Sequence, residues 1–199
     1  MEFSTLEVSL DANVATIALN RPDKANAMSE PMWYEIEQAM QWLDETPEAR
    51  VGILVGRGKY FTSGIDLSLL MSLSAKIEDD DDGRRREKLR RLILRLQDTL
   101  TSIERCRKPV LAAVHGACIG GGIDLITACD MRYCSANAYF TVKEIDVGMT
   151  ADVGTLQRLP RLIGEGMARE LAYTGRRVDG PEAQQMNLVN RCFESPEAL

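Results

Sequence analysis

Three acidic residues in the second half of the chain have the types and surroundings that proton transfer requires. Asp124 follows the glycine run 120–122, and Glu144 and Asp152 flank the stretch 145–151. Carboxylates beside an apolar, glycine-built pocket can move protons at a carbon next to a carbonyl, if donors stabilise the enolate oxygen. Because the sequence alone also permits three surface acids, this prediction depends on whether the three side chains converge.

Each acid also has a plain structural explanation. Asp152 precedes a helical stretch, where aspartate is a good N-cap, and the residues alone favour that role. Glu144 follows the expected strand 138–142 and could be a surface acid. Asp124 lies early in the helical stretch 123–128, among apolar neighbours, and is the least natural surface residue of the three.

The glycine run lies between an expected strand and an expected helix. A helix N-terminus exposes backbone N–H groups, and glycine lets a ligand approach them closely. A tight turn that only glycine fits explains the run equally well. The spacing matches neither a GxGxxG dinucleotide motif nor a Walker loop.

Other catalytic classes fail because the necessary residues are missing from the sequence. His115 is the single histidine and there is no GxSxG motif, which argues against a serine hydrolase. One histidine and five cysteines without a CxxC pair also argue against a zinc site. The cysteines are typical of reduced, buried thiols in an intracellular protein.

Composition predicts one globular domain over residues 1–199. The chain is 45% hydrophobic and 27% charged, and its net charge of −6 argues against nucleic-acid binding. No apolar run approaches the roughly 20 residues needed to span a membrane. The N-terminus lacks the pattern of a signal peptide, which favours a cytoplasmic protein, with a mitochondrial or peroxisomal location left open.

Hydrophobic patterning predicts strands that alternate with helices. Residues 6–10 and 14–19 alternate apolar with small or polar side chains, as the strands of a hairpin do. Residues 51–55 form a continuous apolar run, typical of a strand buried on both faces, and 110–114 is another short buried strand. This order indicates an α/β domain with crossover connections.

Helices are expected between these strands. Ser29 can cap a helix that runs to about Asp44, and residues 67–73 are apolar and expected to be helical. The five consecutive acids 78–82 are expected to form a solvated, mobile loop, since adjacent acids cannot all point at one metal ion. A helix over 87–104 places leucine and isoleucine side chains on one face.

The chain resembles the crotonase family, the enoyl-CoA hydratase/isomerase superfamily, from about Leu6 to its C-terminus. The markers of this resemblance are LNRP at 19–22, KANAM at 24–28, FTSGIDL at 61–67, and the run from KPV at 108 to the glycines at 120–122. The resemblance implies an α/β fold of repeated ββα units wound into a spiral. It also implies an acyl-CoA thioester as substrate, no metal, and no cofactor apart from the coenzyme A part of that substrate.

Within the family, the stretches 120–130 and 142–160 resemble the Δ3,5-Δ2,4-dienoyl-CoA isomerases. Family hydratases typically carry glutamates at the positions of Asp124 and Glu144 and glycine at that of Asp152, so the three acids together match the isomerases. The resemblance implies a 1,5 proton shift through a dienolate in fatty-acid β-oxidation. Glu144 would be the base and Asp152 the acid, in an order that could be reversed, while Asp124 would tune both.

The resemblance also assigns the groups that bind the substrate. The thioester oxygen would lie between the backbone N–H groups of Ile65 and Gly121, and these form an oxyanion hole. Coenzyme A would be held by two short segments of the chain. Their residues are Lys24, Ala25, Ala27, Ser63, Asp66 and Leu67.

Two other functions remain open at this point. A 2-enoyl-CoA hydratase could use Asp124 and Glu144 to hold a water molecule, although Asp152 at the glycine position speaks against it. A catalytically silent acyl-CoA-binding protein is the other alternative. Family members continue past residues 189–193 into a C-terminal helical segment, so this chain is expected to lack or shorten it. A homotrimer or dimer of trimers is expected if that segment is present.

Overall fold

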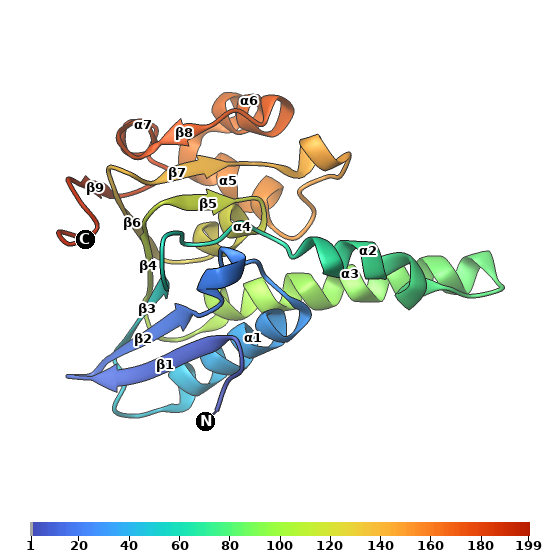
Figure 1. Cartoon of the computed structure of the whole chain (residues 1–199), viewed down its shortest axis with the longest axis horizontal. Helices are drawn as coiled ribbons and strands as arrows, with labels where there is room; N and C mark the ends of the chain where they lie inside the picture. The colour runs from blue at the N-terminus through green and yellow to red at the C-terminus, as the bar shows by residue number, and fades with distance from the viewer. Residues whose placement is uncertain (1) are drawn as a thin grey trace.

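The N-terminal hairpin forms one edge of the larger of two sheets in the computed structural model, which describes residues 2–199 (Figure 1). Strands β1 (Leu6–Asp11) and β2 (Val14–Leu19) pair antiparallel. Ala12 and Asn13 between them have φ values of 46° and 69°, as both central residues of a type I′ turn do. The predicted hairpin is confirmed.

The larger sheet has the order β1-β2-β3-β4-β6-β9, and all pairs after the hairpin are parallel. Its further strands are β3 (Val51–Gly56), β4 (Val110–Val114), β6 (Met131–Ser135) and β9 (Arg191–Phe193). Side chains of β3 alternate between buried and half-buried. The expectation that this strand is buried on both faces was wrong for the second face, which is only partly covered.

A smaller sheet contains β5 (Ala117–Ile119), β7 (Tyr139–Thr141) and β8 (Val178–Asp179). The unit β4-β5-α4 places one strand in each sheet before its helix, and β6-β7-α5 repeats this order. Because β5 and β7 are parallel neighbours, the segments that follow them leave the same edge of the small sheet. Those segments are α4 (Gly121–Thr127) and the 3₁₀ helix η2 (Glu144–Val147).

Helix α3 (Asp82–Arg105) begins at Asp82, five residues before the predicted start at Glu87. The side chain of Asp81 caps it by accepting a hydrogen bond of 2.8 Å from the Arg84 amide. Acidic residues at a helix N-terminus are favourable because they complement its positive end. Residues 78–81 connect α2 to α3 outside any helix, as the predicted loop does, and Asp82 is the first residue of α3.

The remaining helices surround the sheets. They are η1 (Pro22–Lys24), α1 (Glu30–Glu45), α2 (Leu67–Ile77), α5 (Thr155–Ile163), α6 (Glu165–Thr174) and α7 (Gly180–Gln185). Figure 1 shows α1 beside α3, whereas α2 and the first half of α3 extend away from the sheets. The predicted apolar face of α1 is buried, and Ser29 takes the N-cap position without a side-chain capping bond. No helix among residues 2–199 is long and apolar enough to cross a membrane.

Candidate active site

Two cavities of about 100 Å³ each meet at the edge of the small sheet where α4 and η2 begin. The glycine cavity is lined by Gly64, Gly120 and Gly121 and by apolar residues of α2. The leucine cavity is lined by apolar residues of α2 and α3 and by Asp152. Four residues line both cavities, and they mark the junction between them: Ile65, Gly121, Glu144 and Met149.

Two backbone N–H groups lie at this junction. A Cβ atom placed on Gly121 would lie 3.7 Å from the amide nitrogen of Ile65, so the two amides are near neighbours. Neither amide donates a hydrogen bond to another group within the described residues. Two unpaired, adjacent donors can bind the oxygen of a thioester and stabilise the negative charge that develops on it.

Glycine precedes each of these amides for a geometric reason. Gly64 has φ 89° and Gly120 has φ 53°, a backbone region that glycine enters without steric cost. A side chain on Gly64 would place its Cβ 2.6 Å from the backbone oxygen of Ile119. These glycines therefore turn the following N–H groups out of the local hydrogen-bonding pattern and toward the cavities.

Glu144 lies against the same glycines. Its Oε1 is 3.3 Å from the position that a Cβ would take on Gly120, and its Oε2 is buried without a hydrogen-bond partner. Burial raises the pKa of the Glu144 carboxyl, and the charge of Asp152 raises it further. A carboxyl with a raised pKa beside two free amides is suited to remove a proton from a bound thioester.

Asp152 lines the leucine cavity on the side of α3. Helix α5 is capped by Gly154, so the prediction that Asp152 is an ordinary N-cap, favoured by the residues alone, was wrong. The side chain is half-buried, and burial raises its pKa. Glu144 and Asp152 thus contribute carboxyl groups to one cavity.

Asp124 is fully buried and lines neither cavity. Its Oδ1 accepts a hydrogen bond of 2.5 Å from the amide of Thr155, the first residue of α5, so it is Asp124 that binds the N-terminus of this helix. Its Oδ2 has no partner. Burial, and next the charge of Glu144, raise the pKa of Asp124 to about 7. This side chain can influence Glu144 through its charge, without contacting a ligand.

The structure divides the residues predicted to bind coenzyme A into two groups. Ser63 and Leu67 line the glycine cavity. Lys24 is exposed, and Ala25 and Ala27 are half-buried outside both linings.

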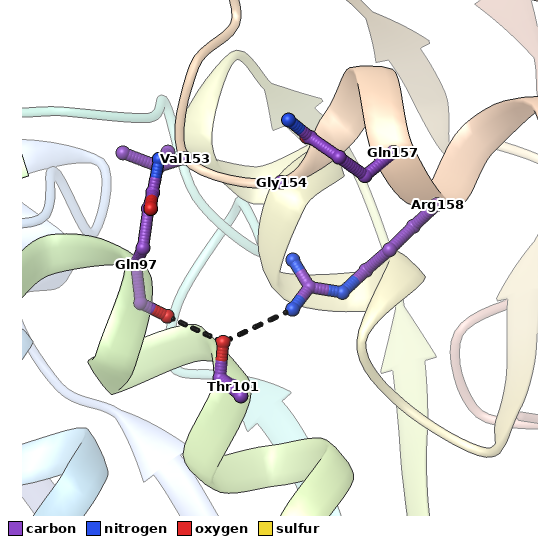
Figure 2. A pocket seen from close by; sticks show the side chains of 6 residues that line it. All are labelled: Gln97, Thr101, Val153, Gly154, Gln157 and Arg158. Carbon is purple, nitrogen blue, oxygen red and sulfur yellow. Dashed lines mark hydrogen bonds between the residues drawn. The ribbon is translucent and has the colours of Figure 1, made fainter. Parts of the chain in front are cut away.

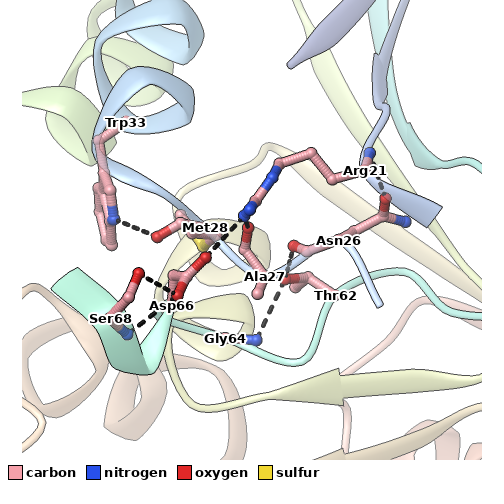
Figure 3. A network of polar contacts seen from close by, with 9 residues as sticks. All are labelled: Arg21, Asn26, Ala27, Met28, Trp33, Thr62, Gly64, Asp66 and Ser68. Atoms are coloured by element: carbon pink, nitrogen blue, oxygen red, sulfur yellow. Dashed lines mark hydrogen bonds and ion pairs between the residues drawn. The ribbon is translucent and has the colours of Figure 1, made fainter. Parts of the chain in front are cut away.

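Asp66 has a structural role in the described chain. Its carboxylate accepts hydrogen bonds of 2.7 Å from the Ser68 hydroxyl and 2.9 Å from Arg21, and these lower its pKa to about 2 (Figure 3). It also caps α2 through the Ser68 amide. The same network includes Asn26, which joins the loop 21–28 to the loop 57–60.

Sequence patterning did not identify the apolar wall of the leucine cavity. Leu89, Leu92, Ile93 and Leu96 were expected only to form the apolar face of a helix, and they line this cavity, with Leu96 also packed against the core. Further along the same face, Leu100 and Ile103 are buried in the core. Periodicity identifies an apolar face, but it carries no information about what covers that face.

No group of three or more histidine, cysteine, aspartate and glutamate side chains within residues 2–199 could hold a metal ion. The arrangement instead combines an amide pair, two cavity-lining carboxyls and a third carboxyl behind them, which suits proton transfer.

Comparison with known proteins identifies relatives along nearly the whole chain. The sequence profile described as enoyl-CoA hydratase/isomerase matches residues 9–198. The peroxisomal Δ(3,5)-Δ(2,4)-dienoyl-CoA isomerase of Arabidopsis thaliana is 49% identical over 99% of this chain and 72% of its own length. The mitochondrial enzyme of the same name from Homo sapiens is 47% identical over 96% of this chain and 58% of its own length.

Solved structures agree with the fold. An enoyl-CoA hydratase subunit from Geobacillus kaustophilus superimposes with a TM-score of 0.85 at 34% identity, covering 99% of this chain and 71% of that one. An enoyl-CoA hydratase/isomerase from Marinobacter aquaeolei gives a TM-score of 0.88 at 27% identity, covering 98% and 72%. The α/β fold expected from the sequence is confirmed.

Proposed function

The chain belongs to the enoyl-CoA hydratase/isomerase family, and we propose that it converts 3,5-dienoyl-CoA thioesters to 2,4-dienoyl-CoA thioesters in fatty-acid metabolism. The isomerases named above support this choice, since their identity to this chain exceeds the 34% of a crotonyl-CoA hydratase from Syntrophomonas wolfei. The observation that carries the proposal is the position of Asp152, which lines the same cavity as Glu144.

The two cavities offer separate places for the two parts of the substrate. The thioester oxygen would accept hydrogen bonds from the amides of Ile65 and Gly121 at the junction. The apolar chain would occupy the leucine cavity, whose leucine and isoleucine wall favours the burial of hydrocarbon. The coenzyme A portion would leave through the glycine cavity past Ser63 and Leu67.

The reaction would then be a proton shift between two carbon atoms of the chain. Glu144 removes a proton from C2, and the electrons of the broken C–H bond delocalise over C2 to C6 and the thioester oxygen. The amide pair stabilises that oxygen. Asp152 donates a proton to C6, which leaves the 2,4-diene. Each turnover leaves Glu144 with one proton more and Asp152 with one proton fewer, and exchange with solvent restores the starting state.

The acids are suited to these roles because their charged forms disfavour one another. Burial raises the pKa of Glu144 and of Asp152, and the charge of Asp152 adds to the rise at Glu144. Close carboxyls of this kind share protons, so that one is ionised while its neighbour is protonated. Asp124, whose pKa is raised to about 7, would hold a further proton near neutral pH and limit the negative charge behind Glu144.

The hydratase alternative requires two carboxyls that hold one water molecule, normally both at the cavity. Asp124 lines neither cavity, and this observation disfavours it as the second ligand of such a water. A silent acyl-CoA-binding protein has no need of two buried carboxyl oxygens without partners, which are costly to retain.

A side-by-side assay tests the proposal. The chain is incubated with a 3,5-dienoyl-CoA and, separately, with a 2-enoyl-CoA, and diene absorbance and hydration are followed. We expect diene isomerisation without rapid hydration. Rapid hydration would favour the hydratase, and inactivity on both substrates would favour the binding protein.

A matched pair of variants connects the activity with Asp152. D152N is expected to lower isomerisation about 100- to 10,000-fold, the range for loss of a general acid. D146N makes the same chemical change at an exposed carboxylate of η2 that pairs with Lys143, and it should retain activity. Equal activity of D152N and the unmodified chain would remove Asp152 from the mechanism.

Three further parts of the proposal rest on the family alone. The reaction as written needs no cofactor beyond the coenzyme A of the substrate. A homotrimer or a dimer of trimers is the proposed assembly, which a mass measurement in solution tests. The cytoplasmic location stays a prediction, since the relatives' names place the plant enzyme in peroxisomes and the human one in mitochondria.

A further inference from the structure

The segment 150–153, which carries Asp152, is held to the described chain by a single hydrogen bond. The Nε2 atom of Gln97 donates to the backbone oxygen of Asp152 at 2.6 Å. Within residues 2–199, no other hydrogen bond joins this segment to another part of the protein. Ala151 and Val153 also pack against the core, so Gln97 supplies the one polar contact in the described chain that fixes the backbone at Asp152 itself.

Gln97 is placed so that it supports the cavity from behind. It follows Ile93 and Leu96 on α3, and both of these line the leucine cavity. Its own side chain lines a separate polar cavity of about 170 Å³ and extends toward Val153 (Figure 2). Val153 lines both cavities, so Gln97 and the substrate would lie on opposite sides of the segment 150–153.

The same face of α3 also holds the start of α5. Arg158 donates hydrogen bonds of 2.7 Å to Glu104 and 3.4 Å to Thr101. A Cβ on Gly154 would lie 1.7 Å from Nη1 of Arg158, so the backbone after Asp152 packs directly on the guanidinium. Helix α3 thus contacts this part of the chain twice, directly through Gln97 at the backbone oxygen of Asp152 and indirectly through Arg158, which packs on Gly154.

We propose that Gln97 is a positioning residue that holds Asp152 at the far carbon of the diene. This inference rests on the proposed isomerisation and adds a residue to it. A glutamine suits the task because its neutral amide binds the backbone carbonyl and leaves the carboxyl free to exchange its proton. Gln97 therefore supports proton delivery at C6, while proton removal at C2 depends on Glu144 and does not require it.

Separate measurement of the two proton transfers tests this division. Q97M keeps the length of the side chain and removes its donor. We expect isomerisation of a 3,5-dienoyl-CoA to fall about 10- to 100-fold, as a misplaced catalytic group does. Deuterium exchange at C2 of the recovered substrate in D₂O should stay within about twofold of the unmodified chain, because Glu144 and the amide pair are unchanged.

Two controls keep the result specific. Q157M makes the same change at an exposed glutamine that lines the same polar cavity and whose side chain donates no hydrogen bond within the described residues, and it should behave as the unmodified chain does. The double variant Q97M/D152N should be no slower than D152N alone, because Gln97 acts through Asp152.

Several outcomes overturn the inference while isomerisation by the unmodified chain is intact. The first is full isomerisation by Q97M, and the second is an equal loss of isomerisation and of C2 exchange in Q97M. The third is a double variant that is slower than D152N by the same factor by which Q97M is slower than the unmodified chain. Absence of isomerisation by the unmodified chain would instead overturn the proposed function and the inference together.

Discussion

The loops on one side of the amide pair satisfy their buried polar groups, whereas the carboxyls on the other side do not. In the loops, fully buried Asn26 accepts a hydrogen bond from the Arg21 amide and donates to the backbone oxygens of Arg57 and Tyr60. Among the carboxyls, Asp124 and Glu144 each bury one oxygen without a partner. Because an unpaired buried polar atom lowers the stability of the folded state, the carboxyl region has a destabilising cost that the loop region avoids.

The same contrast separates two aspartates by their pKa. Hydrogen bonds from Ser68 and Arg21 lower the pKa of Asp66 to about 2, while burial and the charge of Glu144 raise that of Asp124 to about 7. A paired carboxylate stays ionised at neutral pH and has only a structural effect. A buried carboxyl without enough partners can gain or lose a proton near neutral pH, as acid–base catalysis requires.

Among variants that test this contrast between the carboxyls and the loops, the largest effect is expected from neutralising Glu144. E144Q keeps the shape of the side chain and removes its basicity, so isomerisation is expected to fall about 1,000- to 10,000-fold. Stability should stay level or rise, because an amide replaces a buried carboxyl whose charged form is disfavoured. Steady-state kinetics and thermal unfolding measure the two effects. A variant that keeps a tenth of the activity would exclude Glu144 as the base.

D124N tests the carboxyl region through pH. The pKa of Asp124 is raised from 3.8 to about 7 by folding, so the folded protein holds its proton at pH values where the unfolded chain releases it. Stability of the unmodified chain should therefore fall relative to D124N as pH rises from about 4 to about 7, by up to about 1.4 kcal/mol per pH unit. Urea unfolding at several pH values measures the difference. A constant difference would show that Asp124 does not titrate in this range.

N26A tests the loop region. Loss of three hydrogen bonds leaves two carbonyls and one amide without their partner, and the free energy of unfolding is expected to fall by about 2–3 kcal/mol. Thr62 also donates to the backbone oxygen of residue 26 at 2.7 Å, so disorder here should reach the segment 62–65, which ends at Ile65. N20A, at an exposed asparagine, is the control for urea unfolding. Equal stability of the two variants would contradict the structural role.

The smallest expected effect is that of D66N, and its pH dependence has the opposite sign. Asp66 has a folded pKa of about 2, below its ordinary 3.8, so its contribution is present above pH 4 and is lost as pH falls toward 2. The asparagine oxygen can still cap α2, so the cost at neutral pH comes from the lost ion pair with Arg21 and should be at most about 1 kcal/mol. Acid unfolding of D66N and the unmodified chain should converge at low pH. If the stabilities of D66N and the unmodified chain instead converge at high pH, the pKa of Asp66 is not lowered by folding, and the contrast with Asp124 fails.

Much of the fold could be predicted from local sequence, because hairpin geometry and helix periodicity are local. The polar turn after Leu10 and the apolar face of α1 are examples. The start of α3 was missed because a run of acids indicates solvent exposure as readily as it indicates a helix N-terminus.

The site itself depends on contacts between distant residues. The sequence identified Asp124, Glu144 and Asp152. It gave no reason to reject Asp152 as a helix cap, because Asp152 lies just before the helix that it could cap. Only the packing of α4 against α5 shows that Asp124, 31 positions away, takes the amide of Thr155. Gln97 and the leucine wall of α3 were likewise invisible, since a glutamine and a helical apolar face have no distinguishing local pattern.

The place of Asp124 between two helices has an electrostatic consequence. It stands in the first turn of α4 and binds the first amide of α5, so the positive ends of two helix dipoles meet at its carboxyl. Gly121, the first residue of α4, would direct the same positive end at the thioester oxygen. A charged Asp124 and a charged enolate oxygen are thus stabilised by the same positive helix end, and each negative charge weakens the stabilisation of the other. Ligands that mimic the enolate should bind with uptake of a proton, which calorimetry in buffers of different ionisation enthalpy would detect.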